Sequence, residues 1–207
     1  MRVMVTGNLG FLGSHLSDKL FTEGHQVIGV DDVSGGSFEN PEYLIHDQYD
    51  ADCRSKTAIE RIIKGTKPDI VYHLACNASE NLSLFNPTDI GTRLFNGTLN
   101  VLTSSIRHKV KRFVYFSSIA VYGNGKTPFK ESSLPNPEDV YGLLKLTGEQ
   151  LTSMLATVHG MEYVILRPFN VFGERQNMTY PYRNVVTIFM NSILKDEPVY
   201  IYGDGEQ

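Results

Sequence analysis

Short apolar runs alternate with longer amphipathic segments over most of the chain. The apolar runs are rich in β-branched and aromatic residues, and they predict buried strands at 2–7, 26–32, 70–75, 113–118 and 163–169, with a weaker strand at 43–45. The segments between them carry apolar residues at helical spacing and predict helices at 14–22, 57–64, 92–106 and 139–159. Strands and helices in this order predict an α/β fold, a Rossmann-type doubly wound parallel sheet.

The pattern changes after Gly173. Residues 174–183 are polar and rich in tyrosine, and a helix at 184–194 and a short strand at 198–202 follow. We therefore expect one domain over residues 1–175 and the beginning of a smaller, incomplete region over residues 176–207.

The composition is that of an ordinary globular protein, with 41% hydrophobic and 20% charged residues. The net charge of −4 comes without a long run of either sign, so no binding to nucleic acid is expected. No apolar run approaches the roughly 20 residues of a membrane span, and the N-terminus lacks a signal-peptide pattern. Cys53 and Cys76 lie outside any metal-ligand spacing, so we expect reduced thiols, no metal site and a cytoplasmic protein.

Three glycines, Gly7, Gly10 and Gly13, separate the first predicted strand from the first predicted helix. In this context the first glycine permits a tight turn, the second lets the backbone approach a pyrophosphate, and the third lets helix and strand pack closely. Three glycines alone could also form a simple tight turn. Asp31, about eighteen residues after the third glycine, favours dinucleotide binding, because a carboxylate at that distance accepts from the adenosine ribose. This carboxylate and the adjacent Asp32 would repel a 2′-phosphate, which favours NAD over NADP.

Tyr141 and Lys145 lie four residues apart on a predicted helix and therefore on one face. An ammonium group near a phenol favours the phenolate, so the pair could make tyrosine a base at neutral pH. A surface helix with a tyrosine packed on a lysine stem gives the same spacing. The fifth strand delivers Ser117 and Ser118 to the sheet edge where ligands bind. His73, within an apolar strand, is expected to be a hydrogen-bonded core histidine.

Several blocks in a fixed order now resemble one family. They are Thr6-Gly7-x-x-Gly10-Phe11-Leu12-Gly13, Asp31, His73-Leu74-Ala75, Ser117-Ser118-Ile119-Ala120-Val121-Tyr122-Gly123, Tyr141-x-x-x-Lys145, Arg167-Pro168-Phe169-Asn170-Val171-Phe172-Gly173 and Gly203-Asp204-Gly205. Together they resemble the extended short-chain dehydrogenase/reductase family, in its nucleotide-sugar epimerase/dehydratase branch, over essentially the whole chain.

The resemblance implies roles for individual residues. Tyr141 would exchange a proton with a sugar hydroxyl, and Lys145 would lower the pKa of that tyrosine and bind the nicotinamide ribose. Ser118, the third catalytic residue, would orient the substrate oxygen, and Asn170 would lie near the substrate's phosphates. The implied NAD-binding residues are Gly7, Leu9, Gly10, Phe11, Leu12, Gly13, Asp31, Asp32, Ser34, Asp52, Cys53, Leu74, Ala75, Tyr141 and Lys145.

Departures from the family pattern select among its activities. Dehydratases and decarboxylases of this branch keep acidic residues where this chain has Ile119 and Ala120, so dehydration and decarboxylation are not expected. The resemblance then implies a UDP-hexose 4-epimerase that works through a transient 4-keto sugar, as a homodimer. An NAD(P)H-dependent reductase and a non-catalytic NAD-binding protein are the alternatives. Family members continue beyond Gly203-Asp204-Gly205-x-Gln207, so we expect this chain to end inside the substrate-binding region.

Overall fold

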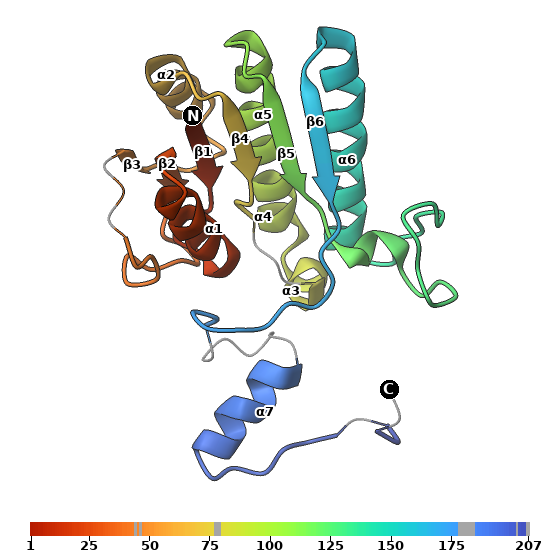
Figure 1. Ribbon diagram of the computed structural model, residues 1–207. Helices are drawn as coiled ribbons and strands as arrows, with labels where there is room; N and C mark the ends of the chain where they lie inside the picture. Colours follow the sequence, from red (N-terminus) through yellow and green to blue (C-terminus); the bar gives the residue numbers. More distant parts are fainter. Residues whose placement is uncertain (44, 46, 77–79, 178–184, 202, 206–207) are drawn as a thin grey trace. The chain divides into compact units, whose positions relative to one another are not determined.

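The computed structural model describes residues 1–207 except 44, 46, 77–79, 178–184, 202 and 206–207. Its strands form one parallel sheet in the order β3-β2-β1-β4-β5-β6 (Figure 1). Their bounds are Arg2–Thr6 (β1), Gln26–Asp31 (β2), Asp47–Asp50 (β3), Ile70–His73 (β4), Arg112–Phe116 (β5) and Glu162–Leu166 (β6). This is the strand order of doubly wound nucleotide-binding sheets, and it confirms the predicted fold class.

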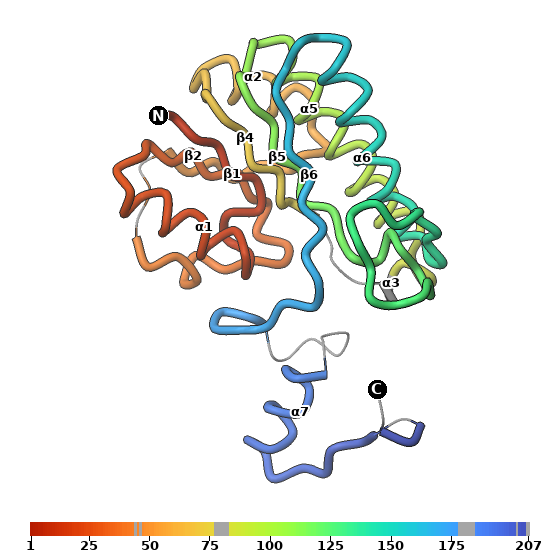
Figure 2. Tube along the Cα trace, turned by 45° about the vertical axis from the view of Figure 1, so that its right-hand side comes forward, coloured from red at the N-terminus to blue at the C-terminus, as the bar shows by residue number. Residues whose placement is uncertain are grey.

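The connections between strands are mostly helical. The α-helices are Phe11–Thr22 (α1), Lys56–Thr66 (α2), Glu80–Phe85 (α3), Pro87–Gly91 (α4), Gly97–Arg107 (α5), Val140–His159 (α6) and Val185–Leu194 (α7), with a π-helical turn at Thr92–Asn96 (η1) and a 3₁₀ turn at Ile119–Tyr122 (η2). Helix α1 covers one face of the sheet, and α2, α5 and α6 lie side by side on the other (Figures 1 and 2).

Alternation along the strands divides the core between these two faces. On β1, Met4 joins the cluster under α2, α5 and α6, which also contains Ile59 and Val101. Its neighbours Val3 and Val5 join the cluster under α1, where Leu20 is buried and Leu16 is packed against it. Leu16 and Leu20 thus form the inward side of α1, and helices pack on both faces of the sheet.

Side-chain caps set where α2 and α6 begin. The Ser55 hydroxyl accepts from the Ala58 N–H at 3.4 Å at the start of α2, and the Asp139 carboxylate accepts from the Gly142 N–H at 2.8 Å at the start of α6. Gly160, at φ +66°, closes α6 in the left-handed conformation that glycine adopts freely. The cap at Asp139 places Tyr141 in the first turn of α6.

Two predicted strands are wrong. The third strand is Asp47–Asp50, a polar edge strand paired with Ile28–Asp31, and not 43–45, of which residue 44 lies outside the described residues. Tyr43 instead donates its N–H to Asp18 and stacks its ring on Phe21. Residues 198–201 form no strand, since no described segment pairs with them, and residue 202 lies outside the description.

The helix expected at 92–106 begins earlier. The side chain of Asn86 caps the start of α4, and Pro87 occupies its first turn. Helix α4 runs through the π-helical turn η1 into α5. The predicted start at Thr92 therefore falls inside a longer helical stretch. Arg93 lies on its π-helical turn η1.

The chain divides into two compact units, Met1–Phe169 and Asn170–Gln207. Within the second unit, Thr187 on α7 donates its hydroxyl to the Gln176 side chain at 2.7 Å. Among the described residues, no helix is long and apolar enough to cross a membrane.

Candidate functional site

The glycine loop, Gly7–Gly13, begins where β1 ends and leads directly into α1. It lies where the connections from β1 and the adjacent β4 diverge, which in such sheets is the ligand-binding crevice. Gly7 has φ +75°, and a Cβ there would lie 2.8 Å from the Ala75 nitrogen. A Cβ on Gly13 would overlap the carbonyl oxygen of Gly7. Both positions therefore require glycine, and the structure brings together Gly7 and Ala75, two of the predicted NAD-binding residues.

The middle glycine, Gly10, stands at the start of α1. Gly10 is the N-cap of α1, no described side chain caps this helix start, and the first turn carries no acidic residue. The free N–H groups of a helix N-terminus favour an anion. Loop and helix start, including Phe11 and Leu12, thus fit the pyrophosphate of a dinucleotide.

Asp31 closes β2 beside this loop. Its buried carboxylate accepts from the N–H of Leu9 at 3.0 Å and from the N–H of Val33 at 2.8 Å. Burial raises the pKa of Asp31, and the two backbone hydrogen bonds oppose that rise. Because one hydrogen bond reaches into the glycine loop, the carboxylate predicted for the ribose and the loop predicted for the pyrophosphate are held together.

Asp32 differs from its neighbour in having a cation beside it. The guanidinium of Arg93 lies 3.1 Å from the Asp32 carboxylate and donates to the Ser34 hydroxyl at 3.1 Å, while Ser34 donates to Asp32 at 2.5 Å. The negative charge of Asp32 is therefore partly compensated. Asp32 is therefore expected to add less than Asp31 to the predicted repulsion of a 2′-phosphate. The sequence reading missed Arg93, because its contact depends on the π-helical turn η1.

Asp52 and Cys53 lie after β3. Partial burial raises the pKa of Asp52, but hydrogen bonds from Arg54 outweigh this and lower it overall. The Cys53 thiol is part of the core, and burial raises its pKa, so the thiol is inert. Leu74 packs under α1. Any cofactor contact at Cys53 would therefore come from its backbone.

The three predicted catalytic side chains come together around the start of α6. Tyr141 and Lys145 are buried on one face of the helix, with the Lys145 ammonium 5.6 Å from the Tyr141 ring centroid. Lys145 donates to the Phe116 carbonyl at 2.7 Å, which ties α6 to the end of β5. The Ser118 hydroxyl accepts from the Ala120 N–H at 3.1 Å, and Ser118 is close enough to Tyr141 to lower the pKa of its phenol.

The charge state of this group differs from the simple expectation. Burial raises the pKa of Tyr141 to about 12, although Lys145 and Ser118 act in the opposite direction. The predicted influence of the lysine is present but smaller than that of burial. Burial also disfavours the ammonium of Lys145, yet the neighbouring Cys76 and Tyr141 outweigh it and raise the pKa of Lys145. Lys145 is therefore charged, and a further positive charge beside Tyr141 would act in the same direction as Lys145 and lower the pKa of the phenol.

Neighbouring residues clarify two other predictions and add one contact that was not predicted. His73 is buried, with hydrogen-bond contacts to the Thr6 hydroxyl at 2.7 Å and the Thr98 hydroxyl at 3.1 Å, so the prediction of a core histidine is confirmed. Ser117 turns its hydroxyl to Glu149, which leaves Ser118 as the serine beside Tyr141. Cys76 lies beside Lys145, a contact that the sequence reading missed although Cys76 directly follows the His73-Leu74-Ala75 block.

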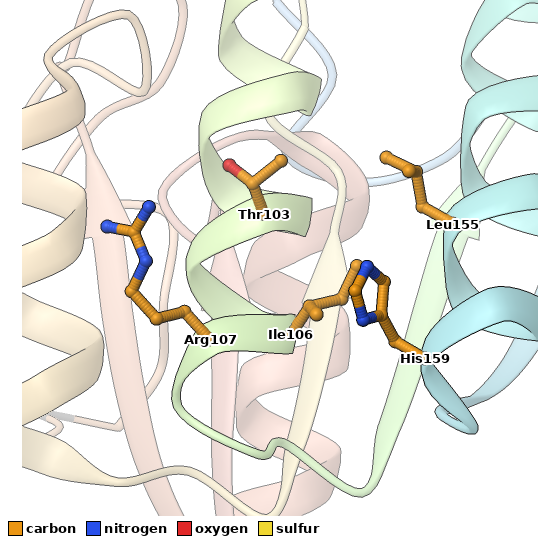
Figure 3. Close-up of a pocket in the computed structure, with 5 residues that line it drawn as sticks. All are labelled: Thr103, Ile106, Arg107, Leu155 and His159. Atoms are coloured by element: carbon orange, nitrogen blue, oxygen red, sulfur yellow. The ribbon is translucent and has the colours of Figure 1, made fainter.

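Asn170 belongs to the second compact unit, so its predicted substrate contact stays a prediction. A cavity of about 390 Å³ lies elsewhere, between α5 and α6, and is lined by Thr103, Ile106, Arg107, Leu155 and His159 (Figure 3). Leu155 is roughly 20 Å along α6 from Tyr141, so this cavity is separate from the catalytic group.

Comparison with known proteins agrees with this geometry. The family model described as NAD dependent epimerase/dehydratase matches residues 3–207. The UDP-glucose 4-epimerase of Mycolicibacterium smegmatis is 32% identical over 99% of this chain and 67% of its own length. UDP-glucuronic acid decarboxylase 1 of Arabidopsis thaliana is 34% identical over 100% of this chain and 48% of its own.

Two solved structures resemble the whole chain. The UDP-glucose 4-epimerase of Thermotoga maritima, solved with UDP-glucose, has a TM-score of 0.95 and 36% identity over 100% of this chain and 67% of its own. The UDP-glucose 4-epimerase of Thermus thermophilus, solved with NAD, has a TM-score of 0.90 and 32% identity over 96% of this chain and 64% of its own. The chain spans about two thirds of the length of these epimerases.

The predicted cofactor, NAD, and the predicted class of NAD-dependent enzyme are thereby confirmed. The family model covers nearly every residue. One edge of the sheet carries the glycine loop and Asp31, and the group of Ser118, Tyr141 and Lys145 lies at the same edge. The chain belongs to the NAD dependent epimerase/dehydratase family.

Proposed function

We propose that the chain carries the NAD-binding and catalytic part of a UDP-hexose 4-epimerase, which inverts a sugar carbon through a transient 4-keto sugar. The proposal rests on the buried group of Ser118, Tyr141 and Lys145, which lies at the sheet edge that also holds the glycine loop. The similarity to epimerases solved with UDP-glucose and with NAD supports the substrate class. In this proposal residues 1–175 form the NAD-binding domain, and residues 176–207 begin the substrate-binding region.

The chain's residues fit NAD at three points. The glycine loop and the start of α1 would hold the pyrophosphate, Asp31 would accept from the adenosine ribose, and Lys145 would donate to the nicotinamide ribose. When bound, NAD supplies a hydride acceptor for the sugar carbon and, in its oxidised form, a positive charge that favours the Tyr141 phenolate.

Tyr141 is the proton carrier. As a phenolate it takes the proton of the sugar 4-hydroxyl, and as a phenol it returns that proton to the same oxygen of the keto sugar. Lys145 favours the phenolate by its charge, and Ser118, beside Tyr141, holds the sugar oxygen within reach. Asn170 would contact the phosphates of the substrate.

Decarboxylation is the competing activity, because decarboxylases are among the relatives. The resemblance implies that such enzymes need an acidic residue where Ile119 and Ala120 stand. These two side chains form the start of the turn η2 next to Ser118, and neither can donate or accept a proton. This favours epimerisation.

The first experiment is to denature the purified protein and identify the released nucleotide by mass and by absorbance at 340 nm. NAD or NADH near one per chain supports an epimerase that retains its cofactor, whereas NADPH would favour the reductase. The protein is then incubated with UDP-glucose, and with UDP-glucuronic acid in parallel. Formation of UDP-galactose is the expected result, and release of CO₂ from the acid sugar would overturn the proposal.

A homodimer is also part of the proposal. Helices α5 and α6 present the cavity shown in Figure 3, and Met154 and Val158 on α6 are exposed. An exposed apolar helix face of this kind suits packing against a second copy. Light scattering should give a dimer for the protein and a monomer for M154E/V158E; a monomeric wild type would remove this part of the proposal.

A further inference from the structure

Glu149 is a buried carboxylate on the same face of α6 as the catalytic pair. It follows Lys145 by one helical turn and Tyr141 by two, and the residue is only 5% exposed to solvent. Arg167, directly after β6, binds it with two hydrogen bonds, Nε to Oε1 at 2.8 Å and Nη2 to Oε2 at 2.6 Å. A bidentate pair of this kind fixes orientation as well as distance.

The same ion pair holds the chain on both sides of Ser118. Before it, the Ser117 hydroxyl donates to Glu149 at 2.5 Å. After it, Arg167 Nη1 donates to the Tyr122 hydroxyl at 2.7 Å, and the guanidinium carbon lies 4.9 Å from the Tyr122 ring centroid. Ser117 and Tyr122 therefore act as two anchor points for the short segment between them.

Backbone hydrogen bonds hold the same segment. The Ser117 N–H donates to the Leu166 carbonyl at 2.7 Å, and the Ile119 N–H donates to the Pro168 carbonyl at 3.0 Å. Gly142 completes the contact from α6, since a Cβ there would lie 2.6 Å from the Ala120 carbonyl oxygen. Ser118 thus lies in a segment clamped between the extension of β6 and the first turn of α6.

We infer that the Glu149–Arg167 pair is a positioning device that sets the distance between the Ser118 hydroxyl and Tyr141. This inference rests on the proposed function. Neither residue contacts the reacting group: Glu149 acts through Ser117, and Arg167 acts through Tyr122. A buried carboxylate is unfavourable without its cation, so both members are needed for the clamp to form.

The decisive test is a double-mutant cycle in the NAD-loaded protein. S117A and Y122F each remove one anchor while keeping the ion pair, and E149Q removes the charge while keeping the shape. We expect each to lower kcat about tenfold or more with KM for the UDP-sugar within about twofold, because small displacements of a positioned group cost rate. In an S118A background the same substitutions should have little further effect on kcat, because the serine they position is absent.

E162Q is the matched control. The Arg112–Glu162 pair, 2.6 Å long, also joins β5 to β6, but at the end of the strands away from Ser118. It should leave kcat unchanged. Equal losses of kcat in the wild-type and S118A backgrounds would show a general structural role and overturn the inference.

A second readout does not need turnover. The phenolate absorbance of Tyr141, taken as the difference between each protein and its Y141F counterpart, reports how closely the Ser118 hydroxyl is held to the phenol. S118A should raise the titration midpoint, and S117A/Y122F should raise it to the same extent without adding to S118A. If the wild type is inactive but shows this titration pattern, the proposed function is refuted and the positioning role is still supported. An unchanged midpoint in S117A/Y122F would refute the positioning role by itself.

Discussion

The glycine loop and the catalytic group share one sheet edge but work by opposite means. In the loop, the decisive feature is the absence of side chains, because a Cβ on Gly7 or Gly13 would meet backbone atoms. In the catalytic group, the decisive features are the side chains of Ser118, Tyr141 and Lys145, whose charge and position depend on neighbours from distant segments. We therefore expect cofactor binding to be sensitive to side-chain volume, and the proposed catalysis to charge and orientation.

The largest effect is expected from Y141F, which should lower kcat and leave NAD binding intact. Loss of the phenol removes the proton carrier, and general acid–base catalysis contributes roughly 10²–10⁴-fold, so kcat should fall by at least this range. NAD content should stay near the wild-type level, because the loop is untouched. Tyr163, exposed on β6, offers Y163F as the control with unchanged kcat. Substantial turnover in Y141F would exclude Tyr141 from the mechanism.

The reciprocal experiment is G13A. The added methyl group would overlap the Gly7 carbonyl, so the loop must shift and NAD uptake should be lost, while the hydrogen bond from Lys145 to Phe116 is unaffected. G65A is the matched control, since nothing lies within 4 Å of a Cβ there, and alanine favours a helix by roughly 1 kcal/mol. Retention of NAD by G13A, measured by mass after denaturation, would contradict the volume argument.

From the buried His73 we predict that the free energy of unfolding depends on pH. Burial lowers its pKa to about 3, with Lys145 adding to the effect, whereas an unfolded histidine titrates near 6.5. Between these values the unfolded state binds more protons, so the free energy of unfolding falls as pH falls from about 6.5. Between pH 6.5 and 5 the loss from this group should be about 2 kcal/mol.

Urea unfolding at several pH values measures this slope. H73N should flatten it, and H159N, at an exposed position, should keep the wild-type slope. Equal slopes for the wild type and H73N would show that His73 is not the titrating group.

The smallest expected effect distinguishes the two carboxylates beside the loop. D31N removes the carboxylate predicted for the ribose, so the ratio of NAD to NADP affinity should fall, by roughly tenfold for one charge-assisted hydrogen bond. D32N should change this ratio less, because Arg93 already compensates Asp32. Isothermal titration with both cofactors checks the ranking, and a larger effect for D32N would reverse it.

Much of the fold could be predicted because its signals are local. The strand ending at Thr6 and the helix beginning at Val140 follow from apolar periodicity and caps. The third strand was misplaced because Asp47–Asp50 is polar, and its place depends on pairing with β2 rather than on its own composition. The cap at Asn86 and the proline after it were present in the sequence but were overlooked.

The sequence by itself determined the glycine loop, the carboxylate proposed for the ribose and the tyrosine–lysine spacing, because these depend on short separations along the chain. Only the tertiary structure decided that Arg93 pairs with Asp32, that burial outweighs Lys145 at Tyr141, and that Glu149 and Arg167 hold the segment around Ser118. The physical reason is that desolvation and ion pairing depend on which distant segments meet, and nothing in the local pattern encodes that meeting.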